Sequence, residues 1–219
     1  MTKEAGPGPL DAEARARAIA KARSLDALRV AAAGCQACEL WRNATQTVFG
    51  SGDEGARLLI VGEQPGDVED REGEPFVGPA GRILDEALES AGIVRDEVYV
   101  TNIVKHFKWR RAPSGKRRLH QRPDKAEVQA CKPWLEAEVA RIGPELIVCL
   151  GATAAQGLLG SDFRVTRQHG HVLPTTLGPP AIATIHPSAV LRAPNSEARA
   201  EALAGLIADL RAAKERLTS

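Results

Sequence analysis

Apolar residues occur in this chain in two patterns, short continuous runs and longer stretches with helical spacing. Four runs of five to seven positions lie at 57–61, 98–104, 146–150 and 181–185. Runs of this kind, without regular polar alternation, are typical of strands buried on both faces of a parallel sheet. Stretches with helical patterns or composition follow these runs, at 79–92, 124–142, 151 onward and 196–217. This alternation predicts an α/β fold, a three-layer αβα sandwich with a central four-stranded parallel sheet.

The remaining segments fit a single domain around this sheet. An Ala-, Arg- and Leu-rich stretch at 11–33 predicts a helix that Gly34 ends. Residues 163–180 predict turns with one minor strand. Glycines and prolines at 6–9 predict a disordered lead over residues 1–9, which leaves 10–219 as one domain.

Polar residues follow each apolar run at its carboxyl end. Glu63 and Gln64 follow the first run within GEQPG, Asn102 lies in the second, Gly151 follows the third, and His186 follows the fourth. The carboxyl ends of parallel strands meet at one edge of a sheet, where open α/β sheets bind ligands. A polar cap on a strand is the ordinary explanation for any one of these residues. Together they favour a functional site at this edge.

The residue types at this edge suit a flat polar heterocycle. An Asn side chain presents donors and an acceptor to the edge of a base, and Phe76, between Pro75 and Gly78, offers a face for stacking. A His such as His186 can donate to an oxyanion that develops on a leaving group. The alternative for Phe76 is an ordinary core residue.

Composition adds little, because the 219 residues are 43% hydrophobic and 26% charged with a net charge of +1. No apolar run approaches the roughly 20 residues of a membrane helix, and the N-terminus has no apolar signal region. We therefore expect a cytoplasmic protein with no membrane partner, and a monomer.

The charge is unevenly distributed. Residues 105–120 contain seven Lys and Arg and no acid, with Phe107 and Trp109 among them, whereas residues 63–74 contain six acids. The basic segment is either a solvated loop or, at this edge of the sheet, a contact for nucleic-acid phosphates, which makes binding salt-sensitive. The acidic segment can brace it by ion pairing.

Four cysteines complete the inventory. Cys35 and Cys38 form a CxxC pair at a predicted helix end, Cys131 lies on a predicted helix, and Cys149 lies in the third run. Four thiolates can bind one zinc ion or an iron–sulfur cluster, and their spacing does not choose between them. Cys149 alone also fits a small core residue.

Several motifs occur together and in order: GEQPG, PFVGPAG, TNIVKH, the four cysteines and HPSAVLR. With them, from about residue 30 onward, the sequence resembles the uracil-DNA glycosylase superfamily, and within it the family 4 iron–sulfur enzymes. The segment KRRLH at 116–120 resembles the KRRIH insertion of the mycobacterial UdgX enzymes, with Leu in place of Ile. Ordinary family 4 members lack this segment and usually carry a small residue in place of Gln64.

The resemblance implies uracil-containing DNA as the partner, preferably single-stranded, and free uracil as a product. It implies that the four cysteines hold a 4Fe-4S cluster. The residues that it implies at the uracil are Gln64, Pro65, Glu69, Phe76, Asn102 and His186. Glu69 is expected near the 5-position of the ring. Those implied at the DNA backbone are Lys105, Lys116, Arg118, Ser188 and Arg192.

In a UdgX-like reaction, His120 rather than water attacks the sugar C1′ atom, and the protein becomes covalently joined to the abasic DNA. Glu63 is then expected to orient His120 by accepting from its other ring nitrogen, with His186 supporting the departing uracil. Two alternatives are an ordinary multiple-turnover glycosylase, with water activated by Glu63, and a non-catalytic iron–sulfur module that binds nucleic acid. By spacing alone His120 also fits a histidine that contacts phosphate.

Overall fold

The computed structural model describes residues 10–113, 115 and 117–218. The lead expected at 1–9 and the DNA contact expected at Lys116 lie outside the described residues.

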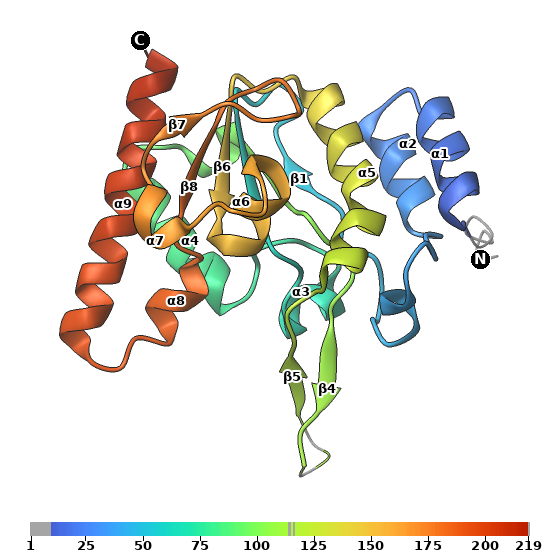
Figure 1. Ribbon diagram of the computed structural model, residues 1–219, viewed down its shortest axis with the longest axis horizontal. Coiled ribbons are helices and arrows are strands. Elements are labelled where there is room, and N and C mark those ends of the chain that lie inside the picture. The colour runs from blue at the N-terminus through green and yellow to red at the C-terminus, as the bar shows by residue number, and fades with distance from the viewer. Residues whose placement is uncertain (1–9, 114, 116, 219) are drawn as a thin grey trace.

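A six-stranded sheet forms the centre of the molecule, in the order β1-β3-β2-β6-β8-β7 (Figure 1). The predicted parallel strands are its four middle members, β3 (Val98–Asn102), β2 (Leu58–Gly62), β6 (Leu146–Leu150) and β8 (Ala181–Thr184). Two short antiparallel strands, β1 (Ser51–Gly52) and β7 (Val172–Leu173), complete its edges. The sheet is therefore mixed rather than purely parallel, and the α/β sandwich is confirmed.

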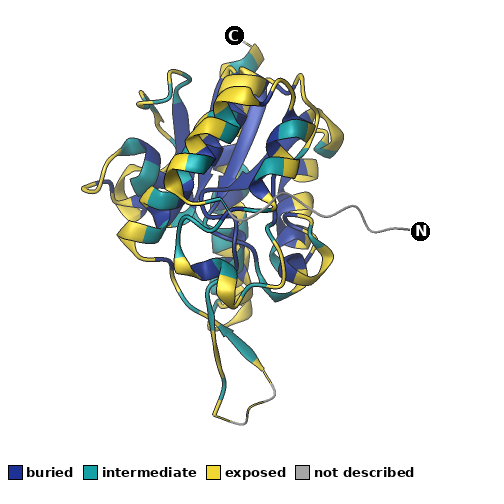
Figure 2. Cartoon of the chain, turned by 90° about the vertical axis from the view of Figure 1, so that its right-hand side faces the viewer, coloured by how far each residue is buried: buried dark blue, intermediate teal, exposed yellow. Residues whose placement is uncertain are grey.

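Side chains alternate between two hydrophobic cores, one on each face of the sheet. Leu58 and Ile60 of β2 face one core, and Leu59 and Val61 face the other. The first core packs under α4 (Pro79–Ser90) and α9 (Ser196–Thr218), with α8 (Pro187–Leu191) beside them. Because both faces of every middle strand are buried, these strands read as continuous apolar runs in the sequence (Figure 2).

The second core lies under the helices of the opposite face: α2 (Leu25–Ala32), α5 (Lys125–Ile142), α6 (Gly151–Leu159) and α7 (Val165–Gln168). The single helix expected at 11–33 is in fact two, α1 (Ala12–Lys21) and α2. The chain is extended at Ala22 and Ser24, and the Ser24 hydroxyl caps α2 by accepting from the Ala27 amide.

Within the described residues, five short helices occupy segments for which no helix was predicted. They are the 3₁₀ turns η1 (Glu39–Arg42) and η2 (Arg95–Glu97), the helix α3 (Asp67–Glu72), and the helices α7 and α8. Helix α3 lies within the acidic segment, directly after β2, and ends at Gly73 in the left-handed conformation. None of the described helices is long and apolar enough to span a membrane.

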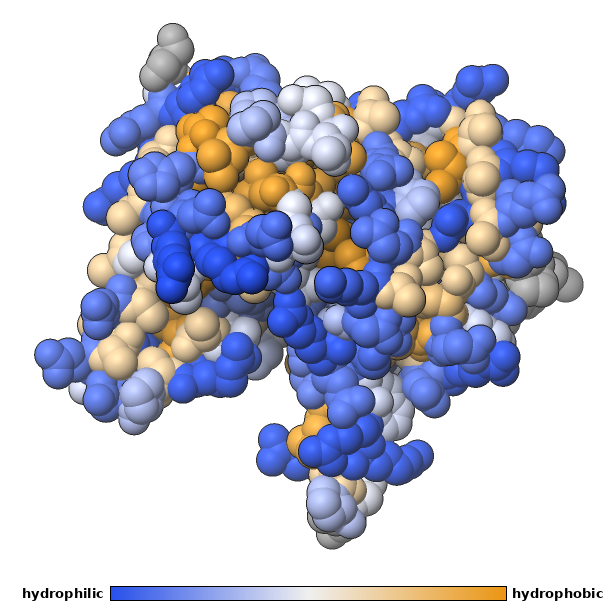
Figure 3. All heavy atoms as spheres, viewed as in Figure 1, coloured by the Kyte–Doolittle hydropathy of each residue, from blue (hydrophilic) through white to orange (hydrophobic). Residues whose placement is uncertain are grey.

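The basic segment forms a two-stranded hairpin, β4 (Trp109–Arg111) and β5 (Arg118–His120). It projects from the body of the molecule on the side of α3, and its exposed surface is largely hydrophilic (Figures 1 and 3). Trp109 pairs with His120 at the base of the hairpin. This register places His120 where the hairpin joins the body rather than at its tip.

Candidate active site

A cavity of about 820 Å³ lies beyond the carboxyl ends of the middle strands. The residues predicted to meet at this edge all line it: Glu63, Gln64, Asn102, Gly151 and His186. The cavity is also lined by Phe76 and, from the hairpin, by His120. The sequence thus predicted which residues meet at this cavity, because parallel strands share a direction.

Phe76 and His186 form one wall of the cavity. Their rings lie 6.3 Å apart at an angle of 27°, close to parallel. Phe76 is buried and has a positive φ of 59°, which is uncommon outside glycine and indicates a backbone held by its surroundings. A Cβ atom on Gly62 would lie 2.7 Å from the Phe76 ring and 2.3 Å from Asn102 Oδ1. Only glycine at position 62 leaves room for both side chains.

Asn102, at the end of β3, carries an unsatisfied acceptor. Its side chain is buried, and its Oδ1 has no hydrogen-bond partner among the described residues. An unpaired buried acceptor costs about 1–3 kcal/mol, so such atoms in native proteins usually have a partner. Because Asn102 lines the cavity, a ligand N–H is the natural partner.

His186 is held in one tautomer by Ser188. The Ser188 backbone N–H donates to His186 Nδ1 at 3.1 Å, and the Ser188 hydroxyl lies 2.8 Å from the same nitrogen. A nitrogen that accepts carries no proton, so the proton is on Nε2. Burial, with Arg192 and His120 nearby, lowers the pKa of His186 to about 4. At neutral pH the residue is therefore an uncharged N–H donor, and Ser188 faces this imidazole.

Glu69 and Pro65 were both expected at the uracil, and the structure places them differently. Glu69 lines the cavity, but its Oε1 accepts from the Gly78 backbone N–H at 2.8 Å and so caps α4. Cβ atoms on Gly66 and Gly78 would each collide with this carboxylate. Pro65 is buried and is not among the described residues that line the cavity. The contact expected between Pro65 and the uracil stays a prediction.

Gln64 holds His120 from the body of the protein. Gln64 Oε1 accepts from the Lys108 N–H at 3.0 Å, and Gln64 Nε2 donates to the carbonyl of Gln121 at 3.0 Å. The same amide nitrogen lies 2.8 Å from His120 Nε2. An amide NH₂ can only donate, so His120 Nε2 accepts and the proton is on Nδ1.

Glu63 approaches the same nitrogen. Its Oε1 lies 3.5 Å from His120 Nε2, the ring nitrogen that the Gln64 amide also contacts. One nitrogen cannot accept from Gln64 and donate to Glu63 at once, so Gln64 suits the neutral imidazole and Glu63 the protonated one. Burial lowers the pKa of His120 below its ordinary value, Glu63 opposes this, and Arg192 adds to it. The balance favours the neutral form.

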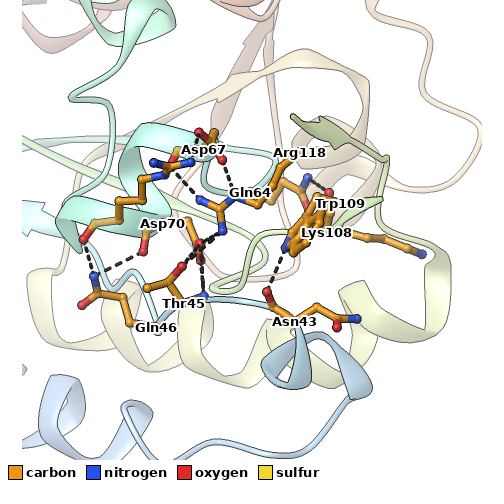
Figure 4. Close-up of polar contacts among 10 residues, drawn as sticks. Asn43, Thr45, Gln46, Gln64, Asp67, Asp70, Lys108, Trp109 and Arg118 are labelled. Carbon is orange, nitrogen blue, oxygen red and sulfur yellow. Dashed lines mark hydrogen bonds and ion pairs between the residues drawn. The ribbon is translucent and has the colours of Figure 1, made fainter. Parts of the chain in front are cut away.

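The acidic segment braces the hairpin through Arg118 (Figure 4). The Arg118 guanidinium pairs with the carboxylates of Asp67 and Asp70, the latter at 2.6 Å, and contacts Thr45 Oγ1 at 3.2 Å. This confirms the predicted ion pairing between the two segments. Because two carboxylates neutralise its charge, Arg118 does not offer the free cation expected at a DNA phosphate. We name this cluster of Arg118, Asp67, Asp70 and Thr45 the hairpin clamp.

Lys105 is not a surface residue. Its side chain is 1% exposed and pairs with Glu138, which is 0% exposed. Its ammonium also donates to the Asn102 carbonyl at 2.8 Å and to Thr101 Oγ1. The expectation that Lys105 contacts DNA is wrong, because a buried and paired ammonium cannot reach a phosphate.

Sequence reasoning assigned no role in the cavity to three polar residues that line it, Asp67, Arg122 and Thr153. Arg122 Nε donates to Thr153 Oγ1 at 2.9 Å, and the Thr153 hydroxyl donates to Glu63 Oε2. Arg122 lies just beyond the basic segment, and Thr153 lies within the Ala-rich helix α6, so neither carried a local signal. Arg192, expected near phosphate, lines the cavity and is exposed at the end of α8.

The four cysteines are free thiols, of which Cys35, Cys131 and Cys149 are buried in the second core and Cys38 packs against it. Cys35 accepts from Trp134 Nε1 at 3.2 Å, and Cys131 accepts from the Lys105 N–H at 3.2 Å. Burial raises the pKa of Cys131 and of Cys149 to about 12, so these thiols ionise only with a strong cationic partner. N–H donors aimed at buried sulfur suit metal-bound thiolates. Within the described residues, however, no three metal-ligating side chains are grouped closely enough to bind a single ion.

The fold and the cavity together define an α/β protein with a ligand site at the carboxyl edge of a sheet. Residues 49–211 match the family model of the uracil DNA glycosylase superfamily, and the chain belongs to that superfamily.

Similar proteins agree with this. A type-4 uracil-DNA glycosylase of Thermotoga maritima is 39% identical over 166 residues, 75% of this chain and 82% of the relative. One of Archaeoglobus fulgidus is 38% identical over 178 residues, 78% of this chain and 85% of the relative. A DNA polymerase of Bacillus phage SP01 is 32% identical over 146 residues, 66% of this chain and 15% of the relative.

Proposed function

We propose that this protein excises uracil from DNA and then becomes covalently joined to the abasic site through His120. The observation that carries the first half is the unsatisfied Asn102 Oδ1 beside the Phe76 ring. A uracil stacked on Phe76 presents its N3–H to such an acceptor. His186, an uncharged N–H donor on the same wall, then donates to a uracil carbonyl oxygen as negative charge develops there. The names of the similar glycosylases support this substrate.

The chemistry balances with the residues present. The N1–C1′ bond breaks, and its electron pair leaves with uracil as an anion. The lone pair of His120 Nε2 then forms a bond to the oxocarbenium-like C1′ atom. The imidazole loses its Nδ1 proton, and uracil gains one. The products are free uracil and an imidazole bonded to the sugar, which lacks a good leaving group, so turnover ends.

The neutral state of His120 supports its role as the nucleophile. Its Nε2 atom carries a lone pair, which the Gln64 amide holds in the free protein at 2.8 Å. The ring also lines the cavity beside Glu63, whose carboxylate stabilises a developing sugar cation. The lone pair becomes available once the bound sugar takes the place of the Gln64 amide.

A second function is favoured by Glu63 itself. Its carboxylate lines the cavity, and in a multiple-turnover glycosylase it activates water in place of the His120 attack. Incubation of the purified protein with a uracil-containing single-stranded oligonucleotide, followed by a denaturing gel, separates the two. A protein–DNA band that survives SDS and heat supports the covalent reaction. Uracil release without that band supports the hydrolytic reaction. If neither uracil nor the band appears, the protein is a non-catalytic module that binds nucleic acid.

We propose single-stranded DNA as the preferred substrate, bound by a monomer. Flipping a base out of a duplex costs a few kcal/mol of unstacking and unpairing, and a single strand avoids most of this. Exposed cations near the cavity, Arg192 and the hairpin's Arg110, Arg111 and Arg117, suit the phosphates. Competition between single- and double-stranded oligonucleotides at two salt concentrations tests this proposal, and gel filtration tests the monomer.

We propose that the four cysteines hold a structural 4Fe-4S cluster. Four thiols suit iron–sulfur or zinc binding. The cluster supplies cross-links between the CxxC segment, α5 and β6, and no step of the reaction uses it. Visible absorbance with iron and acid-labile sulfide in the purified protein is the expected result. Stoichiometric zinc in freshly purified protein would contradict the proposal.

A further inference from the structure

Glu63 has two carboxylate oxygens with different environments. Oε1 faces His120 Nε2 at 3.5 Å. Oε2 accepts from the Thr153 hydroxyl, and Arg122 Nε lies 3.9 Å from it. One oxygen is therefore held by the protein body, and the other faces the residue proposed as the nucleophile.

The direction of the hydrogen bonds on the Oε2 side is fixed. Arg122 Nε–H can only donate, so Thr153 Oγ1 accepts from it at 2.9 Å and uses its own hydrogen for Glu63. Arg122 is itself anchored, because its Nη2 donates to Gln156 Oε1 at 3.2 Å. Linked bonds of this kind polarise and strengthen one another in a site with restricted access to water.

Thr153 and His120, on opposite sides of Glu63, differ in burial. Thr153 is 6% exposed and lies in the first turn of α6, directly after β6. His120, in contrast, has a side chain that is 51% exposed. A carboxylate fixed from α6 therefore gives the hairpin histidine a defined partner.

We propose that Thr153, supported by Arg122, is a positioning residue that fixes Glu63 and so directs the reaction toward attack by His120. The proposal rests on the proposed covalent reaction. With the hydroxyl present, Glu63 keeps Oε2 on Thr153, and Gln64 keeps His120 neutral through Nε2. Without it, the carboxylate turns freely toward His120 and pairs with the protonated ring, which has no lone pair at Nε2 for attack.

Thr153→Val is the decisive variant, because it removes the hydroxyl and keeps the shape of the side chain. Thr153→Ser restores the hydroxyl. Thr184→Val is a matched control, since Thr184 is also buried, lies at the end of β8, and has a hydroxyl without a hydrogen-bond partner among the described residues. The assay follows released uracil and the covalent adduct separately, on a uracil-containing single-stranded oligonucleotide between pH 5 and pH 8.

The ratio of adduct to released uracil is expected to fall about tenfold in Thr153→Val, as a lost charge-assisted hydrogen bond can produce. The rate of adduct formation is expected to begin its decline toward acid at a higher pH, because Glu63 then favours the protonated His120. Arg192 and His186, the other charged or titratable groups near this ring, are unchanged, and Arg122 keeps its charge beside Glu63. Thr153→Ser is expected to behave like the parent, as is Thr184→Val.

An unchanged ratio and pH dependence in Thr153→Val would overturn the proposal, as would a Thr153→Ser variant that behaves like the valine. If the parent protein releases uracil but forms no adduct, the covalent reaction fails on its own. The role of Thr153 is then judged by uracil release, where the valine variant should be about tenfold slower than the serine variant. Equal rates would overturn it.

Discussion

The two sides of the cavity are built in different ways. The side formed by Asn102, His186 and Phe76 comes from strand ends and a tight loop, and these residues are buried or nearly so. The side formed by His120 comes from a projecting hairpin with three-residue strands. The first side is positioned by the sheet, and the second by the hairpin clamp and by Gln64.

In the proposed reaction, the two sides of the cavity therefore act in different steps. The strand-end side binds the base and supports its departure, and it needs no help from the hairpin. The hairpin side decides what happens to the sugar afterwards. A change on one side should therefore affect uracil release, and a change on the other should affect the adduct.

The largest expected effect is from His120→Ala. The adduct should disappear, because no other nitrogen nucleophile lies on the hairpin side of the cavity among the described residues. Uracil release should continue, since the strand-end side is intact. A denaturing gel and a uracil assay on the same samples measure both. His171→Ala, which changes an exposed histidine outside the cavity, serves as the control. An adduct that persists in His120→Ala would refute the nucleophile.

A change on the other side should produce the second largest effect. His186→Ala removes the N–H donor, and uracil release should fall by about 10²–10³-fold, the usual cost of losing one oxyanion donor. The adduct should fall by the same factor, because it forms only after the base has left. Single-turnover rates at saturating DNA provide the measurement. A large loss of adduct with normal uracil release would contradict the division between the two sides.

Breaking the hairpin clamp should have a smaller effect. Arg118→Gln removes the pairs with Asp67 and Asp70, so His120 loses its fixed position, and adduct formation should slow by roughly 10- to 100-fold. Uracil release should change little. Arg110→Gln, the same charge change on an exposed residue of the same hairpin, separates the clamp from general charge. Equal effects of the two variants at saturating DNA would show that the clamp does not position His120.

The smallest effect concerns pH. The pKa of His120 is lowered from 6.5 by burial, and that of His186 is lowered to about 4. The neutral form of both residues therefore predominates above pH 6.5, and both rates should change little between pH 7 and pH 8. Below that range, adduct formation declines as His120 takes up a proton. Uracil release at pH 5.5 should remain at its neutral value, because His186 is still an uncharged donor. A parallel decline of both rates at pH 5.5 would contradict this assignment.

The strand-end side of the cavity was largely predictable from the sequence. Continuous apolar runs identified the four middle strands, and their shared direction brought Glu63, Asn102 and His186 to one edge. The edge strands β1 and β7 were harder, because two residues each carry almost no periodic signal. The break between α1 and α2 was missed, since Ala22 and Arg23 are good helix formers and only Ser24 signals a new cap.

The hairpin side was predictable only in part. The opposite charges of residues 63–74 and 105–120 predicted ion pairing between the two segments. They did not predict that Arg118 would be the residue whose charge these pairs neutralise. Lys105 reads as part of the basic run, yet it lies three residues beyond the end of β3, and its side chain turns into the core toward Glu138 on α5. Thr153 and Arg122 are ordinary residues in the sequence, and they become a pair only because α6 and the end of β5 lie beside Glu63.

The sequence by itself determined the sheet, the edge that carries the site and the residue types available there, because hydrophobic periodicity and strand direction are local properties. Only the tertiary structure decided which nitrogen of His120 faces Gln64 and Glu63, which cations are buried and which carboxylate oxygen Thr153 holds. Those outcomes depend on distances between residues far apart in the chain. A hydrogen bond or ion pair forms only when folding brings both partners within about 3 Å of each other.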